Sequence, residues 1–169
     1  MVLIKYGKNI IFLGIIMEIE KATYEDLEEI LDLQKLAYLT EAKLLNDYSI
    51  KPLTQTLIEF QNEFKNYVTG IVLKLMDNNI IIGSVRAHEE NGRVYIGRLI
   101  VHPEYRNKGY GTKILNTIET FFPNKTFELF TSSKSENNLN LYKKNGYKEF
   151  KREKTQNDLE MVFLEKNHE

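Results

Sequence analysis

Residues 94–122 read VYIGRLIVHPEYRNKGYGTKILNTIETFF, and three kinds of local structure follow one another along them. The first eight residues are mostly branched or aromatic, which predicts a buried strand, and Pro103 ends it because a proline ring cannot continue a hydrogen-bonded ladder. From Tyr110 the apolar residues recur at intervals of three and four, which is the spacing of one helix face. The residues of this face are Tyr110, Ile114, Leu115, Ile118, Phe121 and Phe122. The stretch therefore predicts a strand, a basic loop and a helix.

The loop between that strand and that helix, residues 106–112, has the features of an anion site. Free backbone N–H groups and the positive end of the helix dipole meet at a helix start. Gly109 and Gly111 allow a ligand to approach the main chain, while Arg106 and Lys108 add positive charge. A phosphate or pyrophosphate fits such a loop. The alternative is that the glycines make only a tight turn and the two cations are solvated.

Two common nucleotide-binding patterns do not match this loop. A dinucleotide fingerprint requires a third glycine, but the residue three positions after Gly111 is Ile114. An NTPase phosphate loop requires Gly-Lys-Ser/Thr, whereas Gly111 is followed by Thr112 and Lys113. A nucleotide-binding oxidoreductase is therefore disfavoured.

Residues 99–111, LIVHPEYRNKGYG, resemble motif A of the GNAT superfamily of N-acetyltransferases. In that motif a strand is followed by V-H-P-E-Y-R, then by Arg/Gln-x-x-Gly-x-Gly/Ala, then by a helix. The resemblance implies that the loop holds the pyrophosphate of acetyl-CoA, the cosubstrate, and that the strand main chain pairs with the pantetheine arm. The implied cofactor-binding residues are Leu99, Ile100, Val101, Arg106, Asn107, Lys108, Gly109, Tyr110, Gly111, Thr112 and Asn138.

A second stretch, residues 138–147 (NLNLYKKNGY), is similar to motif B of the same superfamily. The resemblance implies that Tyr142 is the general acid, because a positioned phenol can protonate the departing thiolate. The alternative is that Tyr142 is an amphipathic core residue. Many members have an asparagine seven residues before this tyrosine, where this chain has Ser135. Asn138, one turn before Tyr142, can supply an amide to the same ligand.

Composition and charge narrow the possible functions. The chain has 169 residues, enough for one domain, with 42% hydrophobic and 28% charged residues. A net charge of −1 gives no basic excess for nucleic acid. The absence of cysteine excludes disulfides, thiolate nucleophiles and cysteine metal sites. We expect no metal site, because the histidines are scattered at His88, His102 and His168.

Residues 1–16 differ from the rest of the chain. Two lysines precede an apolar run at residues 10–16 that is too short to span a bilayer and lacks a small-residue cleavage site. We therefore expect an N-terminal extension at 1–16, with Met17 as an authentic initiator, and an acetyltransferase domain at 17–167. The alternative is a segment that contacts a membrane.

The remaining pattern predicts a mixed α/β domain of the GNAT fold, in which a central mixed sheet of about seven strands is flanked by about four helices. A capping box at Thr23 opens the first helix, and a strand–helix–strand order around residues 110–122 predicts a right-handed parallel crossover. The expected strands are 17–22, 67–76, 80–89, 93–101, 126–131, 147–154 and 159–164. The expected helices run from Thr23 to about Leu39, from Pro52 past Phe64, from Tyr110 to Phe122, and from Ser135 or Asn137 to about Lys144.

Simple alternation predicts the two faces of the strand that precedes the loop. One face is expected to carry Tyr95, Gly97, Leu99 and Val101, and the other Ile96, Arg98 and Ile100. Gly97 within the strand predicts a bulge or a close backbone approach. The GNAT resemblance implies that a bulge here splays the strand from its parallel neighbour.

The acceptor site is less defined by the sequence. The resemblance places it between the first and second strands of the domain, where the candidates for contacting an amine are Tyr38, Glu41, Asp47 and Tyr48. Solvated surface residues are the alternative for each. Arg98 stands where some members have an acid, and no general base is assigned among His88, Glu89 and Glu90. Without an acyl-carrying residue, direct transfer in a ternary complex is expected.

These observations predict an acetyl-CoA-dependent N-acetyltransferase that acts on a primary amine of a small molecule or peptide. A non-catalytic acyl-CoA-binding sensor of the same fold is the alternative. The expected location is the cytoplasm, with neither a nucleic acid nor a membrane as partner. A homodimer is expected by analogy with the superfamily.

Overall fold

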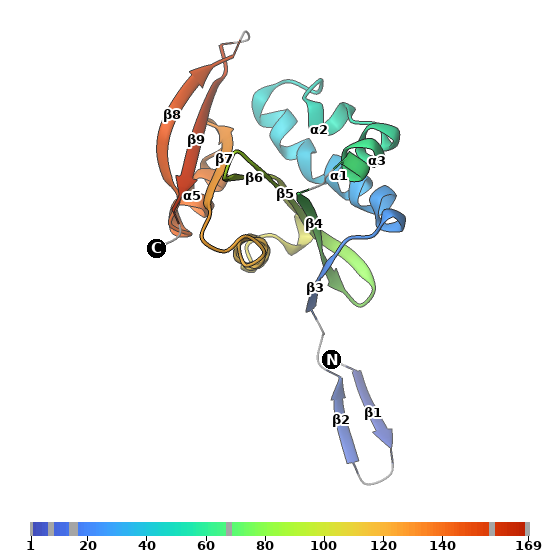
Figure 1. Ribbon diagram of the computed structural model, residues 1–169. Coiled ribbons are helices and arrows are strands. Elements are labelled where there is room, and N and C mark those ends of the chain that lie inside the picture. Colours follow the sequence, from blue (N-terminus) through green and yellow to red (C-terminus); the bar gives the residue numbers. More distant parts are fainter. Residues whose placement is uncertain (1, 7–8, 14–16, 67–68, 156–157, 168–169) are drawn as a thin grey trace.

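The computed structural model describes residues 2–6, 9–13, 17–66, 69–155 and 158–167. Within this part, seven strands form one mixed sheet in the order β3-β4-β5-β6-β7-β9-β8 (Figure 1). Its strands are β3 (Met17–Lys21), β4 (Gly70–Asp77), β5 (Ile80–Glu90), β6 (Arg93–Val101), β7 (Thr126–Ser132), β8 (Lys148–Lys154) and β9 (Glu160–Lys166). The helices are α1 (Leu27–Leu45), α2 (Lys51–Thr54), α3 (Leu57–Asn66), α4 (Tyr110–Glu119) and α5 (Glu136–Lys144). The predicted mixed sheet of seven strands is confirmed, and five helices flank it where about four were predicted.

The N-terminal strands belong to another sheet. β1 (Val2–Tyr6) and β2 (Asn9–Leu13) pair antiparallel with each other and form a separate two-stranded sheet (Figure 1). The predicted boundary lies between residue 16, which is outside the described residues, and Met17, which is the first residue of β3. The division into an extension at 1–16 and a domain at 17–167 stays a prediction.

The predicted capping box opens a short 3₁₀ helix at Tyr24–Asp26, after which α1 begins at Leu27 and ends later than predicted. The Thr23 backbone N–H and hydroxyl both donate to Asp26 Oδ2, at 2.7 and 3.0 Å, which confirms the capping box. The helix ends at Leu45 and not near Leu39, because the apolar spacing continues to Ala42, which is completely buried. Asn46 then adopts a left-handed φ of 53° and stops the helix. The expected second helix is divided into α2 and α3.

The predicted bulge in β6 is present, directly after Gly97, and it reverses the side-chain alternation that was predicted for the end of the strand. Its register with β5 pairs Gly97 with Arg86 and Ile100 with Ser84, so Arg98 and the residue after it oppose a single residue of β5. Arg98 has a φ of 52°. The predicted faces are therefore wrong beyond Gly97. Ile96 packs in the same core as Leu99 and Val101, beside α4, whereas Ile100 packs in the core beside α1.

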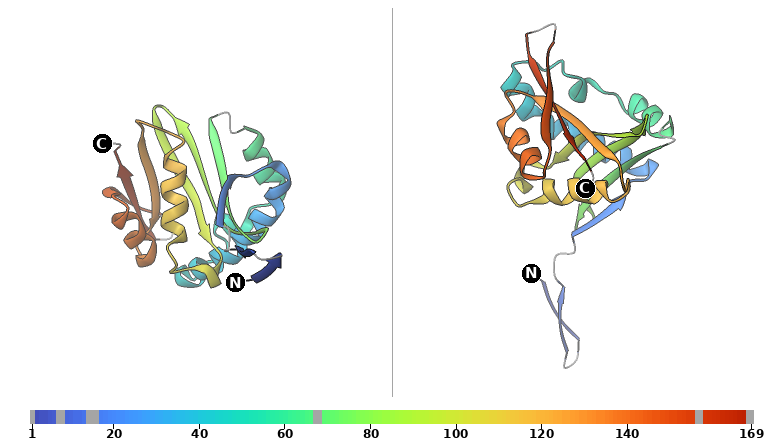
Figure 2. Two further views of the ribbon diagram at one scale, coloured as in Figure 1. Left: turned by 90° about the horizontal axis from the view of Figure 1, so that it is seen from below. Right: turned by 60° about the vertical axis from the view of Figure 1, so that its left-hand side comes forward.

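The parallel crossover is confirmed, and it ends early. β6 and β7 pair only from Arg93 with Thr126 to Tyr95 with Glu128. Beyond Tyr95, no strand of the described chain pairs with the β7-facing edge of β6. The two strands diverge there, with α1 to α3 on one side of the sheet and α4 and α5 on the other (Figures 1 and 2). This opening at the centre of the sheet is where the candidate site lies.

α4 covers the sheet beside this opening. Ile114, Leu115 and Ile118 are completely buried against β4, β5 and β6. The helix ends at Glu119, so Phe121 lies beyond it and is 41% exposed, which corrects its predicted place on the buried face. Close packing depends on Gly83, where an added Cβ would lie 2.6 Å from Ile114 Cδ1.

α5 and the last hairpin complete the fold. α5 ends in a Schellman motif in which the Tyr147 N–H donates to Tyr142 O at 3.1 Å and the Gly146 N–H donates to Lys143 O at 3.1 Å. Gly146 supplies the required positive φ of 90°. The expected turn of the β8–β9 hairpin includes residues 156–157, which lie outside the described residues.

Candidate active site

The loop before α4 presents unpaired main-chain donors to open space. Asn107 and Gly109 have left-handed φ values of 61° and 82°, which turn the chain into the helix. Gly109 is the N-cap residue and supplies no side-chain cap. The Lys113 N–H donates to Gly109 O at 3.0 Å, so the N–H groups of residues 110–112 precede the helical ladder. An added Cβ at Gly109 meets nothing within 4 Å. This geometry fits an anion.

Contacts with α5 hold the start of α4 in place. An added Cβ at Gly111 would lie 3.3 Å from Leu141 Cδ2, so glycine allows the two helices to approach closely. The Asn145 Nδ2 donates to Thr112 Oγ1 at 3.3 Å. Through these contacts, Gly111 and Thr112 of the first motif (residues 99–111 and the helix start after it) pack against the second motif (residues 138–147).

Arg106 was expected to add positive charge to the loop, and its side chain also has a structural role. Its guanidinium donates to Ala37 O at 2.7 Å, to Thr40 Oγ1 at 3.0 Å and to Val101 O at 3.3 Å. Partial burial lowers the pKa of Arg106, which nevertheless stays charged. The side chain therefore ties the loop to α1. Lys108 is exposed and lies over the Tyr105 ring, with Nζ 5.1 Å from the centroid.

The two basic residues of this loop are expected to differ in their effect on stability. Arg106→Met should lower the free energy of unfolding by about 2–3 kcal/mol, because it removes three hydrogen bonds from a charged donor. Lys108→Met should change it by less than about 0.5 kcal/mol, as exposed residues usually do. Urea unfolding of both variants measures the difference; equal losses would contradict this account of Arg106.

The strand residues predicted to hold a pantetheine arm lie on the open side of the sheet centre. Leu99 belongs to the bulge, while Ile100 and Val101 pair with Ser84 and Gly83 of β5. Val101 O also accepts from Arg106 Nε. On the β7 side, these residues lie past the last pair of the β6–β7 ladder. Their main chain is therefore placed beside the opening, as the resemblance implies.

Tyr142 lies in α5 beside the same opening. It is 8% exposed, and its ring centroid lies 6.0 Å from that of Tyr147. Burial first, and then the nearby Tyr38 and Glu41, raise the pKa of Tyr142 well above its ordinary value. The phenol is therefore protonated at neutral pH, which is the form that a general acid requires. Tyr142 also belongs to the main hydrophobic core. A role as general acid and a role in core packing are therefore compatible for this residue.

The start of α5 is joined to α1 and β7. Ser135 occupies the N-cap position, but its hydroxyl makes no cap and instead donates to Glu41 Oε1 in a short hydrogen bond. The Asn138 Nδ2 donates to Thr131 Oγ1 at 3.3 Å. Asn138 thus lies at the β7 side of the opening. No sequence pattern predicts the contact between Glu41 and Ser135, because 94 residues separate them.

The four acceptor candidates separate into two pairs. Tyr38 and Glu41 are close enough to Tyr142 to affect its pKa. Asp47 instead accepts from the Ser49 N–H at 2.8 Å and from its hydroxyl at 2.6 Å, which together lower its pKa. Tyr48 is 60% exposed. The structure therefore brings Tyr38 and Glu41 to the site and leaves Asp47 and Tyr48 in the loop after α1.

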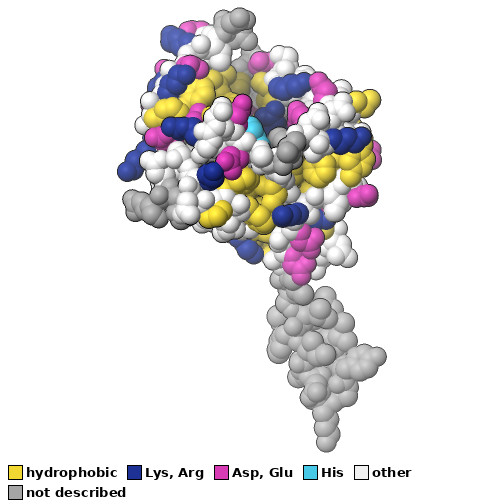
Figure 3. Space-filling view, in the orientation of Figure 1, with side chains coloured by type: hydrophobic (Ala, Val, Ile, Leu, Met, Phe, Trp, Pro, Cys, Tyr) yellow, Lys and Arg dark blue, Asp and Glu magenta, His cyan; other side chains and the backbone are white. Residues whose placement is uncertain are grey.

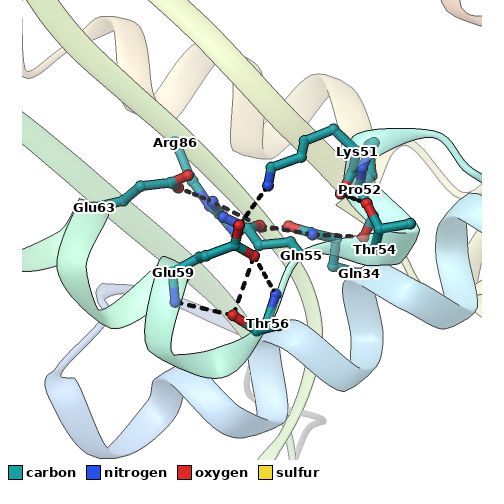
Figure 4. Close-up of polar contacts among 9 residues, drawn as sticks. All are labelled: Gln34, Lys51, Pro52, Thr54, Gln55, Thr56, Glu59, Glu63 and Arg86. Carbon is teal, nitrogen blue, oxygen red and sulfur yellow. Dashed lines mark hydrogen bonds and ion pairs between the residues drawn. The ribbon is translucent and has the colours of Figure 1, made fainter.

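A buried polar network lies under α3, on the α1 side of the sheet (Figure 4). Arg86, 4% exposed, donates to Gln34 Oε1 at 2.6 Å and to Glu63 Oε2 at 3.0 Å. Its guanidinium also lies 3.6 Å from the centre of the Phe60 ring. Gln34 in turn donates to Gln55 Oε1 at 3.0 Å. The positive charge of Arg86 is thus neutralised by Glu63. The sequence analysis did not detect this network, because its members are far apart in the chain.

A cavity of about 230 Å³ adjoins this network. Its lining comes from α3, β5, β6 and β7 and comprises Glu63, Arg86, His88, Tyr95, Ile96, Gly97, Arg98 and Phe130. Figure 3 shows a hollow on this face, with histidine and basic side chains within it. Arg98 extends from the cavity toward Tyr38, whose ring centre lies 6.0 Å from the guanidinium carbon. Tyr38 in turn lies close enough to Tyr142 to affect its pKa. Arg98 and Tyr38 therefore lie between the cavity and Tyr142.

Comparison with protein families gives a match to the Acetyltransferase (GNAT) family over residues 25–147. The match covers most of the chain and both motifs, and the chain belongs to this family. Comparison with curated protein sequences gives no match. In the described part of the chain, no helix is long and apolar enough to cross a membrane.

Solved structures of several acetyltransferases share this fold. The PaiA N-acetyltransferase of Thermoplasma acidophilum, in complex with coenzyme A, has a TM-score of 0.74 and 21% identity over 90% of this chain and 99% of its own. The ribosomal-protein-S18-alanine N-acetyltransferase of Escherichia coli has a TM-score of 0.71 and 12% identity over 90% and 94%. An aminoglycoside 6'-N-acetyltransferase complexed with coenzyme A has a TM-score of 0.70 and 17% identity over 89% and 96%. At these identities the similarity establishes the fold alone.

Proposed function

We propose that this protein is an acetyl-CoA-dependent N-acetyltransferase that transfers an acetyl group directly to a primary amine. The uncapped start of α4 carries this proposal, because its main-chain donors face open space at Gly109, beside the opening between β6 and β7. The coenzyme A bound in the solved structures of the Thermoplasma enzyme and the aminoglycoside enzyme supports the same ligand.

The residues of the site fit a pyrophosphate followed by an extended arm. The N–H groups of residues 107–112 would bind the pyrophosphate, with Lys108 adding exposed positive charge. The main chain of Leu99–Val101 would pair with the pantetheine arm, and Asn138 would add an amide from the other side of the opening. Acetyl-CoA supplies a thioester whose carbonyl carbon accepts the amine nitrogen.

Tyr142 would act at the sulfur. The amine nitrogen forms a bond to the thioester carbon, the carbon–sulfur bond breaks, and the thiolate leaves with the electron pair. The Tyr142 hydroxyl donates its proton to that thiolate, and the phenolate regains a proton from solvent. The Tyr142 phenol holds its proton at neutral pH, as an ordinary tyrosine does, so the proton is available when the thiolate leaves. The attacking amine loses a proton to water, since no described side chain is assigned as the base.

Amine-dependent release of coenzyme A tests the proposal. Purified protein with acetyl-CoA should release free thiol slowly, and an effective amine should accelerate the release. The acetylated amine should appear in equal amount by mass spectrometry. Calorimetric titration should first detect acetyl-CoA binding. Binding without acceleration by any amine would favour the non-catalytic sensor and contradict the enzyme.

A cytoplasmic location and a homodimer belong to the same proposal. The homodimer is supported by an exposed aromatic side chain on β8, Phe150, which is 45% exposed and lies outside the lining of the cavity. Light scattering after size exclusion measures the mass. A value near 19.9 kDa at micromolar concentration would contradict the dimer, and twice that value would support it.

A further inference from the structure

Arg98 lines the cavity, and no carboxylate in the described part of the chain forms an ion pair with its guanidinium. Glu63 and Arg86 neutralise each other across 3.0 Å. Arg98 forms no ion pair within the described part of the chain, and its Nε is buried without a hydrogen-bond partner. The contact that its guanidinium does make is with Tyr38, which is neutral. Arg98 is partly buried, and a partly buried cation without a carboxylate is stabilised by a ligand that supplies the missing charge.

The bulge in β6 places the Arg98 side chain at the cavity. Arg98 is the bulge residue of β6 and adopts a left-handed φ of 52°, which is uncommon for a residue with a long side chain. Because the bulge shifts the alternation, Arg98 lines the cavity and does not enter the core beside α4. Gly97 precedes Arg98 and lines the same cavity, and it leaves the cavity open on its own side, since an added Cβ there meets nothing within 4 Å.

The other walls indicate the size and character of a ligand. Tyr95 and His88 form a stacked pair with centroids 5.4 Å apart, and Phe130 lies on the β7 side. Glu63 offers a partly exposed carboxylate that is already shared with Arg86. A volume of about 230 Å³ suits a small molecule that is partly apolar and carries one anionic group.

We propose that this cavity is the acceptor site and that Arg98 binds a carboxylate of the acceptor, so that the substrate is an amino acid or a similar small amine that carries a carboxylate. The inference rests on the proposed function and adds the class of acceptor. A guanidinium presents parallel N–H donors that match the two oxygens of a carboxylate. Arg98 also contacts Tyr38, so the amine of the bound acceptor would lie near Tyr142.

Matched pairs of acceptors test this without any variant. L-alanine, L-methionine, L-phenylalanine, β-alanine and 4-aminobutyrate are each compared with the amino alcohol of the same skeleton. In at least one pair, we expect kcat/KM to be at least about 10-fold higher for the carboxylate, because a charge-assisted hydrogen bond is lost in the alcohol. Equal rates within all pairs, or a preference for diamines or for phosphoethanolamine, would overturn the carboxylate site.

Variants then assign the effect to Arg98. Arg98→Gln should raise the KM for the preferred amino acid by about 30-fold, while the KM for acetyl-CoA and the rate with the amino alcohol stay within about twofold. Arg98→Lys, which keeps the charge, should retain part of the preference. Arg152→Gln on β8 is the matched control, because Arg152 pairs with Glu149 and Glu160 away from the cavity. An unchanged preference in Arg98→Gln would overturn the assignment.

The two proposals fail in different ways. Acetylation of amines without regard to a carboxylate would overturn the acceptor class and leave the acetyltransferase standing. Binding of acetyl-CoA with no acetylation of any amine would overturn the acetyltransferase, and the acceptor site with it. If Arg98→Gln does not fold, as shown by its circular dichroism, Arg98→Lys and the wild-type pairs still decide the question.

Discussion

Gly109→Glu is expected to abolish measurable binding of acetyl-CoA, with affinity reduced by at least about 100-fold. Gly109 precedes the first turn of α4, and a side chain there projects into open space in front of the free N–H groups. A glutamate would occupy that space, accept hydrogen bonds from the same donors and repel the phosphates. Calorimetric titration of the variant with acetyl-CoA measures the loss.

Gly92→Glu is a closely matched control for this variant. Gly92 has a φ of 79° against 82° for Gly109, and an added Cβ meets nothing within 4 Å at either position. Gly92 lies in the turn between β5 and β6, at the other end of β6 from the loop. Both substitutions should cost about 1–2 kcal/mol of stability through their left-handed backbone, but only Gly109→Glu should lose binding. Similar loss of binding in both would contradict the site.

Tyr142→Phe is expected to lower kcat by about 100-fold while the dissociation constant of acetyl-CoA changes less than about twofold. The substitution removes the proton that the phenol donates to the thiolate and keeps the ring that packs in the core. Its hydroxyl makes no hydrogen bond to a described residue, so the stability of the variant should change by less than about 1 kcal/mol. Thiol-release kinetics with a saturating amine measure kcat.

Tyr147→Phe should give the opposite result. Tyr147 is 2% exposed, lies beside Tyr142, and donates its hydroxyl proton to Glu119 Oε1 at 2.8 Å. Removal of that hydrogen bond to a carboxylate should lower the free energy of unfolding by about 1.5–3 kcal/mol, with kcat nearly unchanged. A Tyr147→Phe enzyme as slow as Tyr142→Phe would show that the loss reflects disturbed packing and not proton donation.

The features predicted well from the sequence are local ones. The strand, the loop and the start of α4 follow one another within residues 94–122, and their apolar spacing and glycines indicate the structure directly. The capping box at Thr23 and the C-terminus of α5 at Gly146 are likewise encoded by adjacent residues. Local signals of this kind do not depend on which distant segments pack against them.

The features that the sequence analysis missed depend on tertiary contacts. Alternation gave the wrong faces for the end of β6, because the bulge falls at Arg98 and one extra residue shifts every later side chain. No local pattern indicates that the Arg106 side chain reaches the carbonyl group of Ala37 in α1. The contact of Glu41 with Ser135 joins two segments that only the folded chain brings together.

The most direct test of the central claim is whether an acetyl group passes from acetyl-CoA to an amine. The protein would be mixed with isotopically labelled acetyl-CoA and the acceptor panel, and the amines and the protein would then be analysed by mass spectrometry. The account predicts label on an amine, released thiol in equal amount, and no label retained on the protein. Label on no amine, with acetyl-CoA bound and intact, would contradict it.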